Sequence, residues 1–157
     1  MSEVFNLLLL QNTLRTATPV VLCALGCLMT DQVGIMNIGV DGMMLMGAFF
    51  AVLGSWMFGS WLMGIVFVTV VGTLLGYFYY IFSIKLKSDE FIIGVALNIL
   101  AGGLTVFLLR TLFGVKGSFS GPGIVPLPTI NIPWLAAIPV VGPILSGNTL
   151  LVYVSWL

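Results

Sequence analysis

Hydrophobic residues run through most of this chain in long blocks separated by a few charged positions. Three uncharged runs stand out, with 15, 43 and 19 residues; their bounding charges are Arg15 and Asp31, Asp41 and Lys85, and Glu90 and Arg110. A helix needs about 20 apolar residues to cross the ~30 Å hydrocarbon core of a bilayer. The runs therefore predict one membrane span, then two spans, then one more.

The 43-residue run must contain a turn, and Gly54–Trp61 is the best place for it. Trp56 and Trp61 suit the membrane interface, where tryptophan is enriched. The expected spans are then residues 14–30, 34–56, 61–84 and 91–112, followed by a truncated segment at 149–157. The pattern predicts an all-α integral membrane protein. We expect a polytopic helix bundle with four full spans, an interrupted second span and a truncated fifth.

Residues 113–148 have a different composition, because six of the seven prolines of the chain fall there. Proline removes a helical hydrogen bond and clashes with the preceding turn, so this stretch cannot form a continuous spanning helix. We predict a long Pro/Gly-rich loop at one membrane face. Residues 1–157 otherwise form a single transmembrane domain.

The amino-acid composition supports the prediction of an integral membrane protein and excludes several functions. Hydrophobic residues make up 60% of the chain and charged residues 6%, against about 25% charged residues in a soluble domain. Five basic and five acidic residues leave no net charge, whereas nucleic-acid binding needs clustered lysine and arginine. Histidine is absent, and neither a P-loop motif nor a catalytic constellation occurs. We therefore expect no enzyme activity, no nucleic-acid partner and no bound metal.

Charge does not determine the orientation in the membrane. Lys85 and Lys87 would lie on one side, and Arg15, Arg110 and Lys116 on the other. The positive-inside rule counts basic residues near the ends of spans. Two against three is too small a difference to decide between the two orientations.

Polar and flexible residues interrupt the second span. Asn37, Gly39, Asp41 and Gly42 lie in otherwise apolar sequence. A carboxylate at the membrane centre costs about 2.5–3.5 kcal/mol, so an intramembrane Asp is a functional candidate. Asp41 and Asn37 are expected to line a translocation route, with the glycines allowing a broken helix. Alternatively, Asp41 is the N-cap of a helix that starts at Gly42; the two interpretations are compatible.

Small residues mark faces that are suited to close helix packing. These residues are Gly72 and Gly76 in the third predicted span, and Gly94, Asn98, Gly102 and Thr105 in the fourth. The Asn98 amide is expected to form an interhelical hydrogen bond or to contact a transported molecule. Asp89 and Glu90 are expected to lie in a solvated loop, with Ser88 or Asp89 as the N-cap of the following helix.

The stretches Gly34–Phe49 and Lys87–Asn98 resemble the permease subunit of an ABC importer. The resemblance is to the branched-chain amino acid/ribose superfamily, and within it to the simple-sugar and nucleoside permeases. Its main element is Asn37-Ile-Gly-Val-Asp41-Gly42, in which the family more often has Glu at the position of Asp41. The resemblance extends over nearly the whole chain from about residue 10.

The resemblance implies that the chain corresponds to the N-terminal half of a permease of roughly twice its length. Such a half would stop before the cytoplasmic loop that docks on the ATPase. Its N-terminus would lie outside, Lys85–Glu90 in the cytoplasm, and residues 113–148 outside. ATP would bind to a separate subunit, so no cofactor is expected in this chain. The implied partners are that subunit, a second permease subunit and an extracellular solute-binding protein, at the bacterial inner membrane.

The sequence leaves three functions open. The first is an alternating-access importer for a nucleoside or simple sugar, with Asn37, Asp41 and Asn98 lining or shaping the route. The second is an ion-coupled secondary carrier or channel in which Asp41 is the coupling carboxylate. The third is a membrane scaffold that transports nothing, in which the polar residues only hold helices together.

Overall fold

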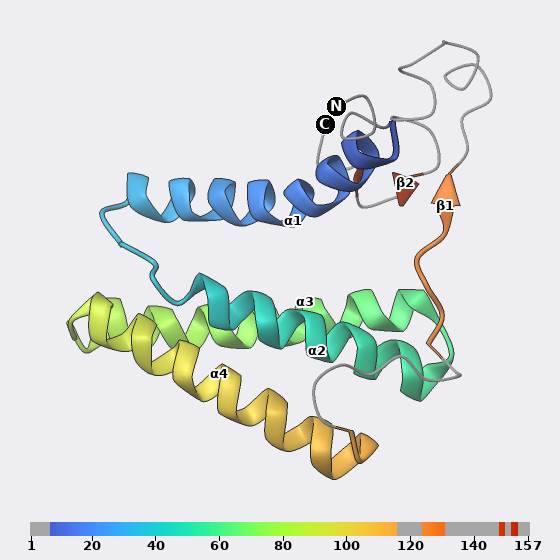
Figure 1. Ribbon diagram of the computed structural model, residues 1–157. Coiled ribbons are helices and arrows are strands. Elements are labelled where there is room, and N and C mark those ends of the chain that lie inside the picture. Colours follow the sequence, from blue (N-terminus) through green and yellow to red (C-terminus); the bar gives the residue numbers. More distant parts are fainter. Residues whose placement is uncertain (1–6, 116–123, 131–147, 150–151, 154–157) are drawn as a thin grey trace. The chain divides into compact units, whose positions relative to one another are not determined.

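The computed structural model describes residues 7–115, 124–130, 148–149 and 152–153 (Figure 1). Its elements are α1 (Leu7–Gln32), α2 (Val40–Phe58), α3 (Trp61–Tyr80), the π-helical turn η1 (Ile81–Lys85), α4 (Glu90–Phe113), and the short strands β1 (Thr129–Ile130) and β2 (Asn148–Thr149). The chain forms two compact units. One comprises Met1–Gly26 with Leu127–Leu157, and the other comprises Cys27–Pro126.

Four helical segments are long and apolar enough to cross a membrane: Asn12–Gln32, Val40–Phe58, Trp61–Lys85 and Glu90–Phe113. The prediction of an all-α membrane protein with four full spans is therefore confirmed. The truncated fifth span, expected at 149–157, is not shown. Thr149 belongs to β2 and pairs with Thr129, and most of the remaining residues of that segment lie outside the described residues.

The first helix is longer than the pattern predicted. It begins at Leu7, whereas the first span was expected from residue 14, and Pro19 lies inside α1. Leucines before Arg15 extend the apolar run and allow the helix to continue through them. Beside the proline, the Thr18 hydroxyl donates a hydrogen bond to the Leu14 carbonyl at 2.8 Å.

The second and third spans form a tight antiparallel hairpin with its turn where the tryptophans predicted it. Gly59, with a φ of 60°, ends α2 in the left-handed conformation, and Ser60 is extended before α3 begins. A Cβ atom on Gly54 would lie 2.9 Å from the Phe67 side chain. One on Gly64 would lie 2.8 Å from the Ala51 carbonyl oxygen. The two backbones therefore approach closely near the turn.

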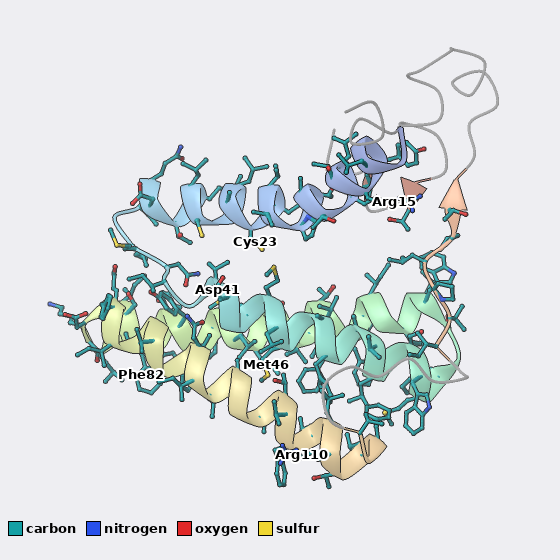
Figure 2. The ribbon with its side chains drawn as sticks, in the orientation of Figure 1. Arg15, Cys23, Asp41, Met46, Phe82 and Arg110 are labelled. Atoms are coloured by element: carbon teal, nitrogen blue, oxygen red, sulfur yellow. The ribbon has the colours of Figure 1, made fainter. Side chains whose placement is uncertain are left out.

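The core of the unit Cys27–Pro126 lies mainly along α2, which packs against both α3 and α4. Met46 points from α2 toward α4 and is 6% exposed (Figure 2). The side chains that α4 contributes include Leu97, Ala101 and Thr105, which are 2–3% exposed. Many large apolar side chains on the outer faces of the helices are exposed, as expected of helices surrounded by lipid.

At the end of the unit where α2 turns into α3, Ser55 anchors the chain that follows α4. The Ser55 hydroxyl donates a hydrogen bond to the Val125 carbonyl and accepts one from the Val125 amide, both at 3.1 Å. In the other unit, β1 pairs antiparallel with β2, with Thr129 opposite Thr149 and Ile130 opposite Asn148. Val125, Ile130 and Asn148 lie within the Pro/Gly-rich loop predicted at 113–148, whose position outside the membrane remains a prediction.

Candidate functional site

The second predicted span is helical only from Val40 onward. Gly34, with a φ of 78°, follows α1, and residues 35–37 have no regular structure. Gly39 occupies the N-cap position of α2. The prediction of an interrupted second span is wrong, because α2 is continuous from Val40 to Phe58 and contains Asp41 and Gly42; the irregular residues precede the helix. We call residues 33–39 the α2 lead-in.

Asn37 shapes the last part of the lead-in. Its Oδ1 atom accepts a hydrogen bond from the Gly39 amide at 3.1 Å, a local turn typical of asparagine. Its Nδ2 atom lies 3.8 Å from the Met43 sulfur, and its carbonyl oxygen lies 4.0 Å from the Cys27 sulfur. The Asn37 side chain is thus used to bend the chain into α2.

Asn98 reaches the same turn from α4. Its Oδ1 atom accepts a hydrogen bond from the Gly42 amide at 2.7 Å, and its Nδ2 atom donates one to the Ile38 carbonyl at 3.1 Å. The amides of the first helical turn have no partner within their own helix. Asn98 therefore supplies from another helix the hydrogen bond that an N-cap side chain ordinarily provides.

Three of the predicted glycines make this contact between α2 and α4 possible. A Cβ atom on Gly42 would lie 2.8 Å from the Asn98 Oδ1 atom, and one on Gly94 would lie 2.9 Å from the Gly39 nitrogen. The corresponding position on Gly39 is 3.2 Å from a Leu97 methyl group. The remaining predicted glycines are not part of this contact: within the described residues no atom lies within 4 Å of a Cβ placed on Gly72, Gly76 or Gly102.

Asp41 is exposed in the first turn of α2 (Figure 2). Its negative charge is favourable at a helix N-terminus. The interpretation of Asp41 as the N-cap is wrong, because the helix starts at Val40 and Gly39 occupies the cap position. Asp41 lies near one end of the span Val40–Phe58, where a carboxylate costs less than at the membrane centre.

A second polar cluster holds the beginning of the lead-in. Glu90, the first residue of α4, accepts hydrogen bonds from the Met36 amide at 2.6 Å and from the Ser83 hydroxyl at 3.0 Å. The Tyr79 hydroxyl donates to the Met36 carbonyl at 2.8 Å. Both backbone groups of Met36 are therefore bound by side chains from other elements. We call Glu90, Ser83, Tyr79 and Met36 the Glu90 clamp.

The contacts of the Glu90 clamp were not predicted from the sequence. Glu90 was expected in a solvated loop, and this is wrong, because its carboxylate is bound to two other elements. The N-cap prediction for the same turn is confirmed: Asp89 Oδ1 accepts from the Phe91 and Ile92 amides at 2.9 and 3.4 Å. The signal in the sequence is the spacing of Tyr79 and Ser83, which are four residues apart at the end of a span and therefore share a helix face.

The π-helical turn η1 contributes to the clamp. The Leu86 amide bonds to the Ile81 carbonyl five residues earlier at 3.0 Å, and Ser83 is buried within this turn. π-Helical turns are rare in proteins, and those that do occur are often found at functional sites. Figure 2 shows that η1, which contains Phe82, lies at the opposite end of its unit from Arg110 near the end of α4. The clamp and the α2 lead-in belong to the η1 end.

A pocket of about 210 Å³ adjoins the lead-in. Its lining residues are Cys27, Leu28, Asp31, Met36 and Asn37. Within the described residues, no group of three His, Cys, Asp or Glu side chains is placed to hold a metal ion. The site thus consists of a broken helix start, two asparagine amides and two carboxylates, Asp41 and Glu90.

The sequence of the chain is similar to those of known transport proteins. The family model described as the permease component of branched-chain amino acid transport systems matches residues 9–157. The chain is 31% identical over 159 residues to the guanosine ABC transporter permease protein NupQ of Bacillus subtilis, an alignment covering 92% of this chain and 49% of that protein. No solved structure matches the chain significantly.

Two further relatives have similar identities. The nucleoside ABC transporter permease protein NupC of Lactococcus lactis is 32% identical over 149 residues, covering 90% of this chain and 46% of that protein. The putative glucose ABC transporter permease protein TsgC13 of Haloferax volcanii is 32% identical over 152 residues, covering 95% and 44%. The chain spans about half the length of the curated relatives it matches.

Proposed function

Because the chain belongs to the family of branched-chain amino acid transport permease components, we propose that it acts as a permease subunit of an ATP-driven ABC importer. Members of this family are transporter components and not enzymes. The four apolar helices and the ABC permease relatives make the chain a multi-pass cell membrane protein. We further propose which molecule the chain transports, which partners it has and how it works.

We propose a nucleoside as the transported molecule, with a simple sugar as the second choice. Two of the relatives are named for guanosine or nucleosides, and one is named for glucose. Nucleosides and sugars share ribose-like hydroxyl groups, which amide side chains can bind. Asn37 and Asn98 are the amides nearest the broken start of α2.

The observation that carries the transport proposal is the break before α2, capped by the Asn98 side chain from α4. The irregular residues 33–39 lie between the apolar spans Asn12–Gln32 and Val40–Phe58, and transporters often form their substrate sites at the ends of discontinuous helices. A start of α2 held by side chains can be repositioned as α4 moves. Asn37, Asp41 and Asn98 would then line or shape the route during alternating access.

The proposed partners follow from the family. A separate subunit would bind ATP, a second permease subunit would complete the pathway, and a solute-binding protein would deliver the molecule from outside. The predicted loop at 113–148 would face that protein, and Lys85–Glu90 would lie in the cytoplasm. This orientation rests on the family resemblance.

Uptake of radiolabelled guanosine and glucose, in cells with and without the gene, tests the proposal. Each is measured after ATP depletion with the ion gradients maintained, and after collapse of the gradients with ATP maintained. We expect gene-dependent guanosine uptake that stops only when ATP is depleted. Uptake that stops with the proton or sodium gradient would instead identify an ion-coupled carrier that uses the exposed Asp41 carboxylate. Absence of gene-dependent uptake would favour a scaffold.

A further inference from the structure

The α2 lead-in is held at two separate points. Asn98 binds it at Ile38 and also binds Gly42 in the first turn of α2, and the Glu90 clamp binds it at Met36. The first contact involves a residue already proposed to shape the route. The second involves residues with no part in that proposal, although it lies one residue before Asn37.

Glu90 joins three elements through one carboxylate. Oε2 accepts from the Met36 amide in the lead-in, Oε1 accepts from the Ser83 hydroxyl in η1, and the side chain itself belongs to α4. Tyr79 adds a hydrogen bond from α3 to the other backbone group of Met36. Hydrogen bonds to an ionised carboxylate are stronger than those between neutral groups. The position of the Met36 peptide is therefore tied to both η1 and α4.

Stabilising the start of α4 does not require this carboxylate. Asp89 already caps α4 by accepting hydrogen bonds from the Phe91 and Ile92 amides. Asp89 and Glu90 are thus adjacent acidic residues with different partners. The hydrogen bonds of Asp89 remain within its own helix, whereas those of Glu90 reach the lead-in and η1.

We propose that Glu90 is a positioning residue for transport. By holding the Met36 peptide against η1 and α4, it determines where the lead-in carries Asn37 and where the first turn of α2 presents Asp41. Glu90 does not contact the transported molecule in this role. The inference rests on the proposed transport function.

Cys27 provides a native reporter of the lead-in. Its sulfur lies 4.0 Å from the Asn37 carbonyl oxygen, and it lines the same pocket as Met36 and Asn37. In a Cys23→Ser background, the rate at which N-ethylmaleimide labels Cys27 measures how closely the lead-in covers this thiol. The measurement is made on the assembled transporter in membrane vesicles, without substrate or nucleotide.

The decisive comparison is Glu90→Gln against Asp89→Asn. A Gln at position 90 keeps one acceptor oxygen but loses the charge and the second acceptor. We expect Glu90→Gln to raise the labelling rate of Cys27 by about tenfold, the shift expected when one hydrogen bond to a charged group is lost. Ser83→Ala should raise it less, because the bond to the Met36 amide remains. Asp89→Asn should leave the rate unchanged.

Uptake kinetics then separate positioning from stability. We expect Glu90→Gln to raise the KM for guanosine by more than it lowers the maximal rate, at unchanged protein abundance, while Asp89→Asn keeps the wild-type KM. An unchanged Cys27 labelling rate in Glu90→Gln would overturn the proposal. So would an equal increase in Asp89→Asn, or faster labelling with unaltered uptake kinetics.

The two proposals fail in distinguishable ways. Cys27 labelling requires no substrate, so it tests the clamp even if guanosine and glucose are not transported. Wild-type vesicles without ATP-dependent uptake would reject the proposed function and, with it, the transport role of Glu90. Normal wild-type uptake together with an unaffected Glu90→Gln variant would reject only the positioning role.

Discussion

Asn98 and Gly42 meet where α4 crosses the start of α2, with the Asn98 Oδ1 atom 2.7 Å from the Gly42 nitrogen. The contact needs both residues. The amide provides an acceptor for a helix-start N–H group, and the glycine leaves room for it, since a Cβ atom would lie 2.8 Å from the same oxygen. The packing of α4 against the start of α2 therefore depends on a polar residue of one helix and a small residue of the other.

Replacing Asn98 with Leu should lower both stability and uptake. The Gly42 amide and the Ile38 carbonyl would lose their partner, and each unsatisfied buried group costs about 1–3 kcal/mol. We expect a clearly lower Tm for the purified protein and loss of most uptake. Thr111→Val is the control on the same helix, because the Thr111 hydroxyl donates its hydrogen bond to the Phe107 carbonyl of its own helix. Equal Tm values for the two variants would contradict the prediction.

Replacing Gly42 with Ala should be destabilising, whereas Gly72→Ala should be nearly neutral. The added methyl group at position 42 would overlap Asn98, and overpacking of this kind costs typically about 1–3 kcal/mol. Nothing among the described residues lies within 4 Å of the same position on Gly72. Thermal unfolding of the two purified variants measures the difference. A Gly72→Ala variant as unstable as Gly42→Ala would show that Gly72 packs against a surface outside the described residues.

Replacing Asp41 with Leu should abolish uptake and leave membrane insertion intact. Asp41 is exposed, and Gly39 rather than Asp41 occupies the N-cap position of α2. Removal of the Asp41 carboxylate should therefore cost little stability. Membrane fractionation and uptake assays on the same cells measure the two properties separately. Asp41→Asn tests whether the charge itself is needed. Normal uptake in Asp41→Leu would remove this residue from the route.

Replacing Ser55 with Ala should loosen the segment after α4 without unfolding the helices. The Ser55 hydroxyl donates one hydrogen bond to the Val125 backbone and accepts another from it. Loss of about 1 kcal/mol of hydrogen bonding should speed hydrogen exchange of the Val125 amide roughly fivefold. Ser60→Ala is the matched control, since Ser60 makes no side-chain capping bond at the start of α3. Unchanged exchange at Val125 in Ser55→Ala would contradict the anchoring role.

The bounds of the membrane spans were predictable from the sequence where they depend on the hydrophobicity of neighbouring residues. The third and fourth spans, expected at 61–84 and 91–112, are observed as Trp61–Lys85 and Glu90–Phe113. Apolar run length and bounding charges fix such spans directly. The first helix shows the limit, because it begins at Leu7, well before Arg15, the charge that bounds the first apolar run.

The partners of the polar residues were not predictable in this way. Asn37, Asp41 and Asn98 were singled out because polar groups in a membrane are costly, but their cost does not say which atoms satisfy them. Asp41 was offered as the cap of α2, and the cap contact comes from Asn98 on α4 instead. Glu90 resembled an ordinary loop carboxylate, and its contact with Met36 depends on the bend before α2 and on η1.

The sequence by itself determined that this chain crosses the membrane in four helices, and which polar and small residues lie in and between them. Those features depend on residues close together in the chain, whose hydrophobicity and spacing can be read directly. Only the tertiary structure decided that Asn98 caps α2 and that Glu90 holds Met36. These pairs are separated by 56 and 54 residues, and their contacts exist only once α4 packs against the start of α2.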